Sequence, residues 1–140
     1  MNEFQVAMGL CNLKYIDEEI AKRKVIVEFY RKKLSGTSGI VINEYKNGLS
    51  PNYAYFPILL SCEEKRNLVH DKLVEKGIVS RKYFYPITSD AACFKNKYKN
   101  INVIRARDYA KRVLVLPLYS DMEEDTVIKI SDIVLKNGEE

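Results

Sequence analysis

The stretch "YAYFPILL" (residues 53–60) is the strongest β-strand signal in this sequence. It combines aromatic and branched apolar residues, and it follows a turn cluster, "NGLSPN" (47–52). Pro57 has no amide hydrogen to donate, so we expect an edge strand or a bulge there. After the strand, Ser61 predicts the N-cap of a helix, and Glu64, three residues on, completes a capping box.

Further elements are predicted on either side of this strand. Apolar residues recur at helical spacing from about Glu3 to Leu34, a pattern that leaves room for a bend near Asp17. This helix is followed by strands at 39–43 and 53–60, a helix at 61–76, a strand at 78–84, a helix at 103–113, a strand at 114–117 and a helix at 123–135.

This order predicts an α+β fold, in which a small, mainly antiparallel sheet of three or four strands is covered by helices. We expect the long N-terminal helix to pack along the sheet. The chain is predicted to form one domain, residues 1–140, with a flexible tail at 136–140.

The composition is that of a globular protein, with 46% hydrophobic and 30% charged residues and a net charge of +4. No apolar run approaches the roughly 20 residues of a membrane helix. No secretion signal precedes the first helix, so we expect a cytoplasmic protein with no membrane partner. Cys11, Cys62 and Cys93 are odd in number and widely spaced. We therefore expect reduced thiols packed as small apolar groups.

The sequence contains no recognisable catalytic motif. His70 is the only histidine and lies mid-helix in "NLVHDKL" (67–73), so we expect it at the surface. A Ser–His–Asp or Cys–His arrangement would have to be built around that one residue. Neither a glycine-rich nucleotide loop nor a metal-binding spacing is present. We predict no catalytic, cofactor-binding or metal-binding residue in this chain.

The segment "SRKYFYP" (80–86) is the best candidate for a binding site. In strand geometry Tyr83 and Tyr85 lie on one side and Phe84 lies on the other, which suits the core. Tyrosines beside cations can hold a phosphorylated or sugar-bearing ligand by hydrogen bonds and stacking. Arg81, Tyr83 and Tyr85 are therefore the predicted substrate-binding residues. The alternative is that the aromatic residues of this segment line a protein interface or cover the edge of the sheet.

Basic residues gather around this segment. Nine of them lie between residues 81 and 112, against two acids, whereas residues 121–140 hold seven acids and two lysines. A basic stretch beside an acidic tail suits an anionic ligand, although an uneven solvated surface gives the same pattern. RNA-recognition motifs have a glycine after the first cation, which "RKYFYPI" lacks, so we expect no nucleic-acid partner. The nine are Arg81, Lys82, Lys95, Lys97, Lys99, Arg105, Arg107, Lys111 and Arg112.

Three segments, in order, resemble the DegT-type sugar aminotransferases. The first 34 residues are similar to the family pattern R-M-[STN]-E-x-Q-A-A-x-G-x-x-Q-L, with departures at Val6 and Asn12. "KGIVSRKYFYPI" (76–87) resembles the segment before the family's substrate-side loop, and residues 110–118 match A-x-R-x-L-x-L-P-L. The matching residues of the first segment are Met1, Asn2, Glu3, Gln5, Ala7, Gly9, Leu13 and Asp17.

The resemblance implies the C-terminal small domain of a pyridoxal-phosphate enzyme of the aspartate aminotransferase fold. Such an enzyme passes an amino group, with glutamate as the expected donor, to a keto sugar on a nucleotide carrier. The cofactor-binding lysine and the acid that pairs with the cofactor's ring belong to the family's large domain. This chain alone is therefore expected to be inactive and to bind no cofactor.

The partners that the resemblance implies are that large domain, a nucleotide sugar and a second copy of the enzyme in a homodimer. The alternative is a free-standing α+β binding or regulatory module without catalysis.

Overall fold

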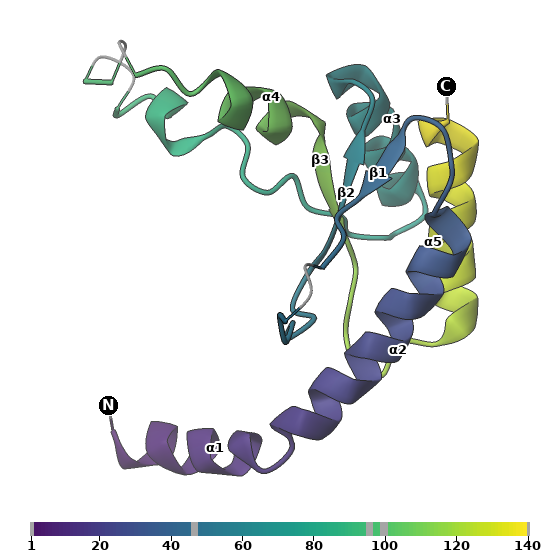
Figure 1. Cartoon of the computed structure of the whole chain (residues 1–140). Helices are drawn as coiled ribbons and strands as arrows, with labels where there is room; N and C mark the ends of the chain where they lie inside the picture. Colours follow the sequence, from purple (N-terminus) through teal and green to yellow (C-terminus); the bar gives the residue numbers. More distant parts are fainter. Residues whose placement is uncertain (1, 46–47, 95–96, 99–100, 140) are drawn as a thin grey trace.

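The computed structural model describes residues 2–45, 48–94, 97–98 and 101–139. Three strands and five α-helices make up this part of the chain (Figure 1). In chain order they are α1 (Glu3–Leu13), α2 (Ile16–Leu34), β1 (Ile40–Ile42), β2 (Phe56–Leu60), α3 (Glu63–Glu75), the short 3₁₀ helix η1 (Thr88–Asp90), α4 (Ile104–Arg112), β3 (Val113–Leu116) and α5 (Glu124–Gly138).

The strands form one antiparallel sheet in the order β1-β2-β3, which confirms the predicted α+β class. Alternate residues of β2 are buried on the face that α2, α3 and α5 cover (Figure 1). There the Tyr30 ring of α2 stacks on Phe56, with 4.8 Å between the ring centroids. Fully buried side chains of all these elements fill the core: Leu34, Phe56, Ile58, Leu60, Val69, Leu73, Val127, Ile130 and Val134.

Pro57 lies in the central strand, so the expected edge strand or bulge was wrong. Its partner in the register is Val115 of β3, whose amide and carbonyl both bond to Arg81 on the opposite side. Pro57 and Val115 therefore face each other as a non-hydrogen-bonded pair. On the other side β1 has already ended, at Ile42. The missing amide hydrogen of Pro57 thus removes no bond from the sheet.

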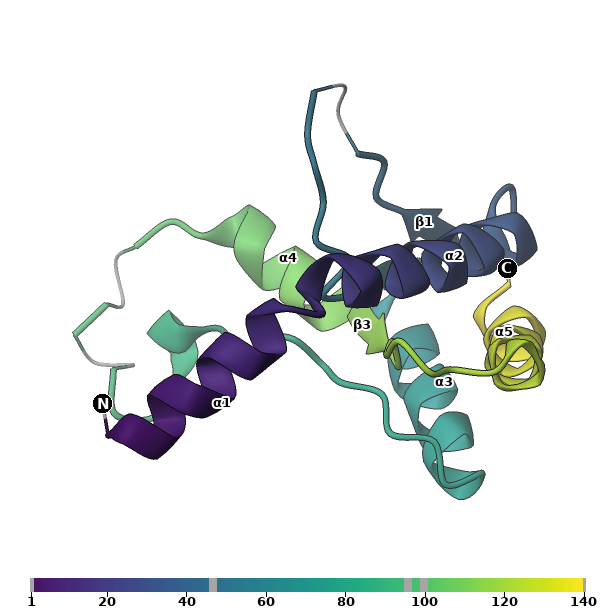
Figure 2. The ribbon, with the colours of Figure 1, turned by 90° about the horizontal axis from the view of Figure 1, so that it is seen from below.

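The predicted helix at 3–34 is two helices, α1 and α2. They meet at Lys14 and Tyr15 rather than bending near Asp17. Asn2 and Gln5 cap α1 reciprocally, each side chain accepting the other residue's amide hydrogen at 2.9 and 3.0 Å. No residue of α1 is buried, and the helix projects from the rest of the chain as an arm (Figure 2). The expectation that the whole N-terminal helix packs along the sheet was therefore wrong for its first third.

Two helix ends differ from the prediction. Cys62, not Ser61, is the N-cap of α3, because its sulfur accepts the amide hydrogen of Lys65 at 3.5 Å. α5 continues to Gly138, into the segment 136–140 that we expected to be a flexible tail, and Glu140 lies outside the described residues. A Cβ at Gly138 would lie 3.0 Å from Leu60, so this glycine allows the close approach of α5 to the sheet.

The predicted strand at 78–84 is reduced to a single bridge, between Arg81 and Val115. The amide of Tyr85 donates back to the carbonyl of Lys82 at 3.0 Å, so the chain turns before a second pair forms. The three cysteines are free thiols. Cys11 and Cys93 are exposed, so the expectation that they are packed was wrong. No helix in the described part of the chain is long and apolar enough to cross a membrane.

Candidate functional site

Arg81 and Tyr83 form the centre of the candidate site. A nitrogen of the Arg81 guanidinium donates to the Tyr83 hydroxyl, and the guanidinium carbon lies 5.5 Å from the centroid of the same ring. This hydrogen bond raises the pKa of Arg81 above its usual value, so the side chain stays cationic. Tyr55, next to β2, meets the Tyr83 ring edge-on, at 5.7 Å between centroids. One cation and two phenol rings thus lie together where β2, β3 and the bridge at Arg81 meet.

The structure places Tyr85 and Phe84 differently from the prediction. Phe84 is 76% exposed and stacks on Tyr83 at 4.8 Å, so its assignment to the core was wrong. The Tyr85 ring lies 4.8 Å from the guanidinium carbon of Arg66 on α3 rather than beside Tyr83. Strict alternation fails because the backbone turns after Lys82. Of the three predicted site residues, the structure brings Arg81 and Tyr83 together and gives Tyr85 a separate partner.

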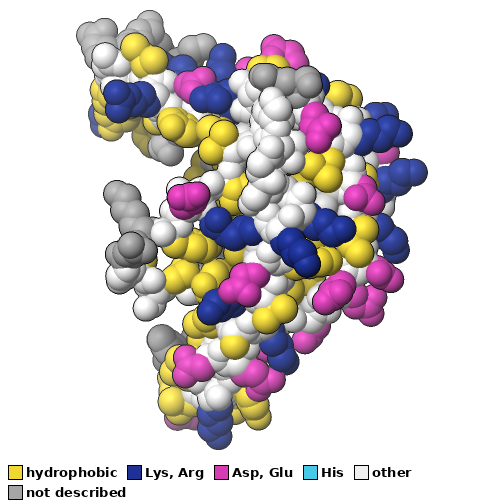
Figure 3. Space-filling view, turned by 45° about the vertical axis from the view of Figure 1, so that its right-hand side comes forward, with side chains coloured by type: hydrophobic (Ala, Val, Ile, Leu, Met, Phe, Trp, Pro, Cys, Tyr) yellow, Lys and Arg dark blue, Asp and Glu magenta, His cyan; other side chains and the backbone are white. Residues whose placement is uncertain are grey.

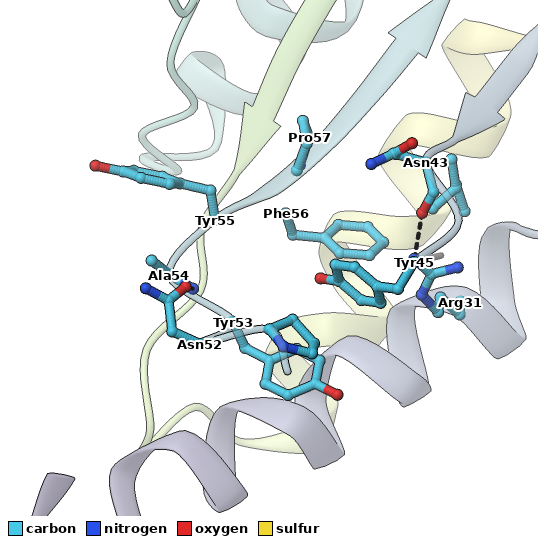
Figure 4. Close-up of a pocket in the computed structure, with 11 residues that line it drawn as sticks. Arg31, Asn43, Tyr45, Asn52, Tyr53, Ala54, Tyr55, Phe56 and Pro57 are labelled. Carbon is cyan, nitrogen blue, oxygen red and sulfur yellow. Dashed lines mark hydrogen bonds between the residues drawn. The ribbon is translucent and has the colours of Figure 1, made fainter. Parts of the chain in front are cut away.

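Two hollows flank Tyr55. One, of about 210 Å³, lies between α2 and the segment that precedes β2, with the rings of Tyr45 and Tyr53 in its wall (Figure 4). The guanidinium of Arg31 donates to the carbonyl of Asn43 at its rim (Figure 4). The other hollow, also of about 210 Å³, contains Arg81. Tyr55 belongs to both linings, and in Figure 4 its ring points away from Tyr53.

Three of the seven described basic residues between 81 and 112 form ion pairs, and a fourth donates to an amide oxygen. Arg107 makes two bonds to Asp90, at 2.7 and 2.8 Å, while Arg112 pairs with Asp108 and Lys111 with Glu63. Lys82 donates to the amide oxygen of Asn67 at 2.8 Å. Lys95 and Lys99 lie outside the described residues. Arg81 makes no ion pair with a described carboxylate, so its charge remains available to a ligand.

His70 is half-buried rather than fully exposed. Its Nδ1 lies 2.8 Å from the hydroxyl of Ser80, which is only 4% exposed. Burial lowers the pKa of His70, and the nearby charges of Lys82 and Arg66 lower it further, while Asp71 acts in the opposite direction.

Pyridoxal phosphate does not fit the two hollows beside Tyr55. It requires a lysine for its aldehyde carbon, an acid near its ring nitrogen and donors for its phosphate. The residues found in the walls of the two hollows beside Tyr55 include arginines but neither a lysine nor a carboxylate. A search of the described residues likewise finds no group of His, Cys, Asp and Glu side chains that could hold a metal ion.

The family model of the DegT/DnrJ/EryC1/StrS aminotransferases matches residues 1–135. The chain therefore belongs to this aminotransferase family. The dTDP-4-amino-4,6-dideoxy-D-glucose transaminase of Escherichia coli is 38% identical over 139 residues, which cover 96% of this chain and 38% of that protein. The transaminase of the same name from Shigella dysenteriae is 32% identical, over 89% of this chain and 35% of its own length. The chain thus spans little more than a third of these relatives.

Solved structures show the same fold. DesV of S. venezuelae, in complex with a ketimine intermediate, superposes with a TM-score of 0.89 at 20% identity, over all of this chain and 37% of its own. PseC of Helicobacter pylori, an aminotransferase in pseudoaminic acid biosynthesis, gives 0.87 at 21% identity, over 99% and 38%. The pyridoxal-phosphate form of the sugar aminotransferase Spr1654 from Streptococcus pneumoniae gives 0.83 at 22% identity, over 99% and 36%. These neighbours confirm the expected domain fold.

Sequence analysis did not include Tyr55 among the site residues. It belongs to the strand signal "YAYFPILL", where an aromatic residue is sufficiently explained by β-propensity. Only the antiparallel pairing of β2 with β3, and of β3 with Arg81, brings Tyr55 next to Tyr83. Contacts between such distant segments leave no local signal in a single sequence.

Proposed function

We propose that this chain is the C-terminal, substrate-side domain of an aminotransferase that converts a nucleotide-linked keto sugar into an amino sugar. The observation that carries the proposal is the extent of the match to the Escherichia coli transaminase. That match covers 96% of this chain but only 38% of the relative. In the parent enzyme, pyridoxal phosphate supplies the electron sink, glutamate donates the amino group, and the absent large domain holds the cofactor.

In this proposal Arg81, Tyr83 and Tyr85 contact the substrate, and Tyr55 is added to them. The diphosphate of a nucleotide sugar carries negative charge, which the unpaired guanidinium of Arg81 is suited to bind. The rings of Tyr83 and Tyr55 meet edge to face at 5.7 Å and offer a wall against which the sugar or the nucleoside can pack. Tyr85 can contact the substrate only if the substrate extends along the segment that carries this residue.

The proposal also fixes the expected partners. The parent would work as a cytoplasmic homodimer, and its large domain would cover the surface that this chain leaves open. By itself the chain is expected neither to transaminate nor to hold the cofactor as a reducible lysine adduct. Borohydride reduction in the presence of pyridoxal phosphate, followed by peptide mass spectrometry, tests this. An adduct on one particular lysine, accompanied by activity, would overturn the proposal.

The site assignment is tested in an enzyme of full family length that carries this segment. This is either the natural longer chain or a chimaera with the Escherichia coli relative. Loss of the Arg81 charge should remove a charge-assisted bond, so we expect Arg81→Met to raise the KM for the nucleotide sugar roughly tenfold to a hundredfold. Tyr83→Phe removes only a hydroxyl and should cost about 1 kcal/mol, or roughly fivefold.

Arg105→Met is the matched control, because Arg105 belongs to the same basic run and is exposed on α4. It should leave the KM within about twofold, since surface positions without buried contacts contribute little. Equal effects of Arg81→Met and Arg105→Met would show that only the overall charge matters, and the site would have to be placed elsewhere.

A further inference from the structure

Three neighbouring residues of α3 hold the segment that carries the candidate site. Arg66 lies against the ring of Tyr85 at 4.8 Å, Asn67 accepts from Lys82 Nζ at 2.8 Å, and His70 Nδ1 lies 2.8 Å from Ser80 Oγ. His70 follows Arg66 by four residues and Asn67 by three, the two spacings that bring side chains to the same side of a helix. One side of α3 therefore contacts residues 80, 82 and 85 in turn. We call Arg66, Asn67 and His70 the α3 clamp.

The opposite side of the same segment is fixed by the sheet. The amide of Arg81 donates to the carbonyl of Val115 at 3.0 Å, and the amide of Val115 donates back at 2.8 Å. These two backbone bonds fix residue 81 only. Beyond it the backbone makes one further bond, from the Tyr85 amide to the Lys82 carbonyl, and that bond lies within the segment itself. Besides the ring contact of Tyr83 with Tyr55, contacts to α3 tie residues 82–85 to the rest of the fold.

Burying the charged side chain of Arg66 in this place carries a desolvation cost. Its side chain is only 1% exposed, its Nε and Nη1 have no hydrogen-bond partner in the structure, and its contact with Glu63 is 3.5 Å long. Burial lowers its pKa, although Glu63 and Tyr85 act in the opposite direction. An apolar residue of the same shape would avoid the desolvation cost and is often as stable or more stable. Core packing alone therefore does not account for an arginine here, whereas the stacked contact with Tyr85 does.

We propose that the α3 clamp positions Arg81 and Tyr83 for the ligand by holding residues 80, 82 and 85, an inference that rests on the function proposed above. The clamp residues contact residues 80, 82 and 85 but neither Arg81 nor Tyr83. Arg81 lines the hollow beside Tyr55, and Tyr83 contacts the Tyr55 ring. The clamp residues themselves do not contact the substrate. Their role is to keep a segment that has only one bridge to the sheet in a single position.

The experiment separates this positioning role from folding. Arg66→Met keeps the shape and removes the charge, so the melting temperature should not fall. The amide of Tyr85 should exchange hydrogen roughly tenfold faster, the scale of a lost cation–π contact, while the amide of Arg81, held by β3, should not change. Asn67→Ala should have the same local effect if Arg66→Met fails to fold. The matched control is Lys72→Met on the same helix, since Lys72 pairs with the exposed Glu75 and contacts no described residue of the segment 80–86 by a hydrogen bond or ion pair.

The second readout is kinetic and uses the full-length enzyme, with dTDP-4-amino-4,6-dideoxy-D-glucose as the probe amino sugar. Arg66→Met should raise its KM roughly fivefold to tenfold with little change in kcat, and Arg66→Lys should recover part of the loss. Unchanged exchange at Tyr85 in both clamp variants would overturn the clamp. Faster exchange with an unchanged KM would overturn its positioning role, provided that Arg81→Met raises the KM. If Arg81→Met has no effect either, the proposed function fails while the exchange result still decides whether the clamp exists.

Discussion

Burial and two neighbouring positive charges disfavour the protonated form of His70. Burial disfavours the charged ring, Lys82 and Arg66 repel it, and the opposing attraction of Asp71 is weaker, so the pKa lies below the ordinary value of 6.5. Ser80 Oγ can accept from a charged ring or donate to a neutral one, so its bond of 2.8 Å does not itself require either state. The folded chain thus binds fewer protons at His70 than the unfolded chain does.

A pH dependence of stability follows from this. A histidine with a lowered pKa contributes stability that is present above the unfolded value of 6.5 and is lost as the pH falls towards the folded value. We expect the free energy of unfolding to decrease between pH 7 and pH 5, and His70→Gln to flatten that slope. Chemical denaturation at several pH values measures it. If the free energy of unfolding of the variant depends on pH with the same slope, the carboxylates rather than His70 cause the pH dependence.

The elements that sequence reasoning predicted well are those with a local signal. β2, α4 and β3 appear within a few residues of their expected places, because aromatic and branched runs and helical spacing act through nearby residues. The segment at 78–84 fails for the opposite reason. It has strand composition, but the turn at Lys82 and the contacts of Ser80, Lys82 and Tyr85 with α3 outweigh strand propensity.

The candidate site shows the same division. Arg81 and Tyr83 were found because they stand in one short motif. Tyr55 lies 28 residues before its partner Tyr83, and Arg66 lies 19 residues before its partner Tyr85. An arginine in the first turn of a helix ordinarily predicts a solvated side chain. Its burial depends on how α3 packs against the rest of the fold, which composition and spacing do not encode.

At the level of the helices, α1 and α2 differ in what they contribute to stability. α2 buries Ile26, Val27, Tyr30 and Leu34, whereas no residue of α1 is buried. Deleting residues 2–13 should therefore change the free energy of unfolding by less than about 1 kcal/mol, the range of exposed positions. By contrast, Leu34→Ala in the core should cost about 2–5 kcal/mol. Urea denaturation of the two variants compares them, and a large loss on deletion would mean that α1 docks on the domain in solution.

The whole molecule has an open side. In Figure 1 the arm formed by α1 and the segment that contains η1 and α4 extend in the same direction from the sheet, away from the layer of α2, α3 and α5. The space-filling view shows hydrophobic side chains, in yellow, at the surface of the arm formed by α1, at the bottom of the picture (Figure 3). If the function proposed above is right, we expect the remainder of the parent enzyme to pack against this open side, because the chain spans 38% of its Escherichia coli relative.

Without that remainder, the chain should self-associate. Phe4, Met8, Leu10 and Leu13 on α1 are 73%, 53%, 60% and 66% exposed, and they are neighbours on one short helix. Phe4 and Met8 lie four residues apart on one side of α1, and Leu10 and Leu13 lie three residues apart on another, so the helix exposes apolar side chains on more than one side. Soluble monomers rarely expose so much apolar surface. Burying it against a second copy removes apolar area from water at about 25 cal/mol per Å². We expect the weight-average mass in sedimentation equilibrium to rise with concentration from the micromolar to the millimolar range.

The double variant Phe4→Glu, Met8→Lys should suppress this association, because it places charges on the apolar surface of α1 without touching the core. Val79→Glu is the matched control, since Val79 is 72% exposed but lies outside α1. It introduces a charge at an equally exposed apolar position, so it should leave the association unchanged if α1 is the contact. A native chain that remains monomeric at millimolar concentration, or an equal effect of Val79→Glu and the double variant, would show that the arm is not a docking surface and that the open side is not kept for another domain.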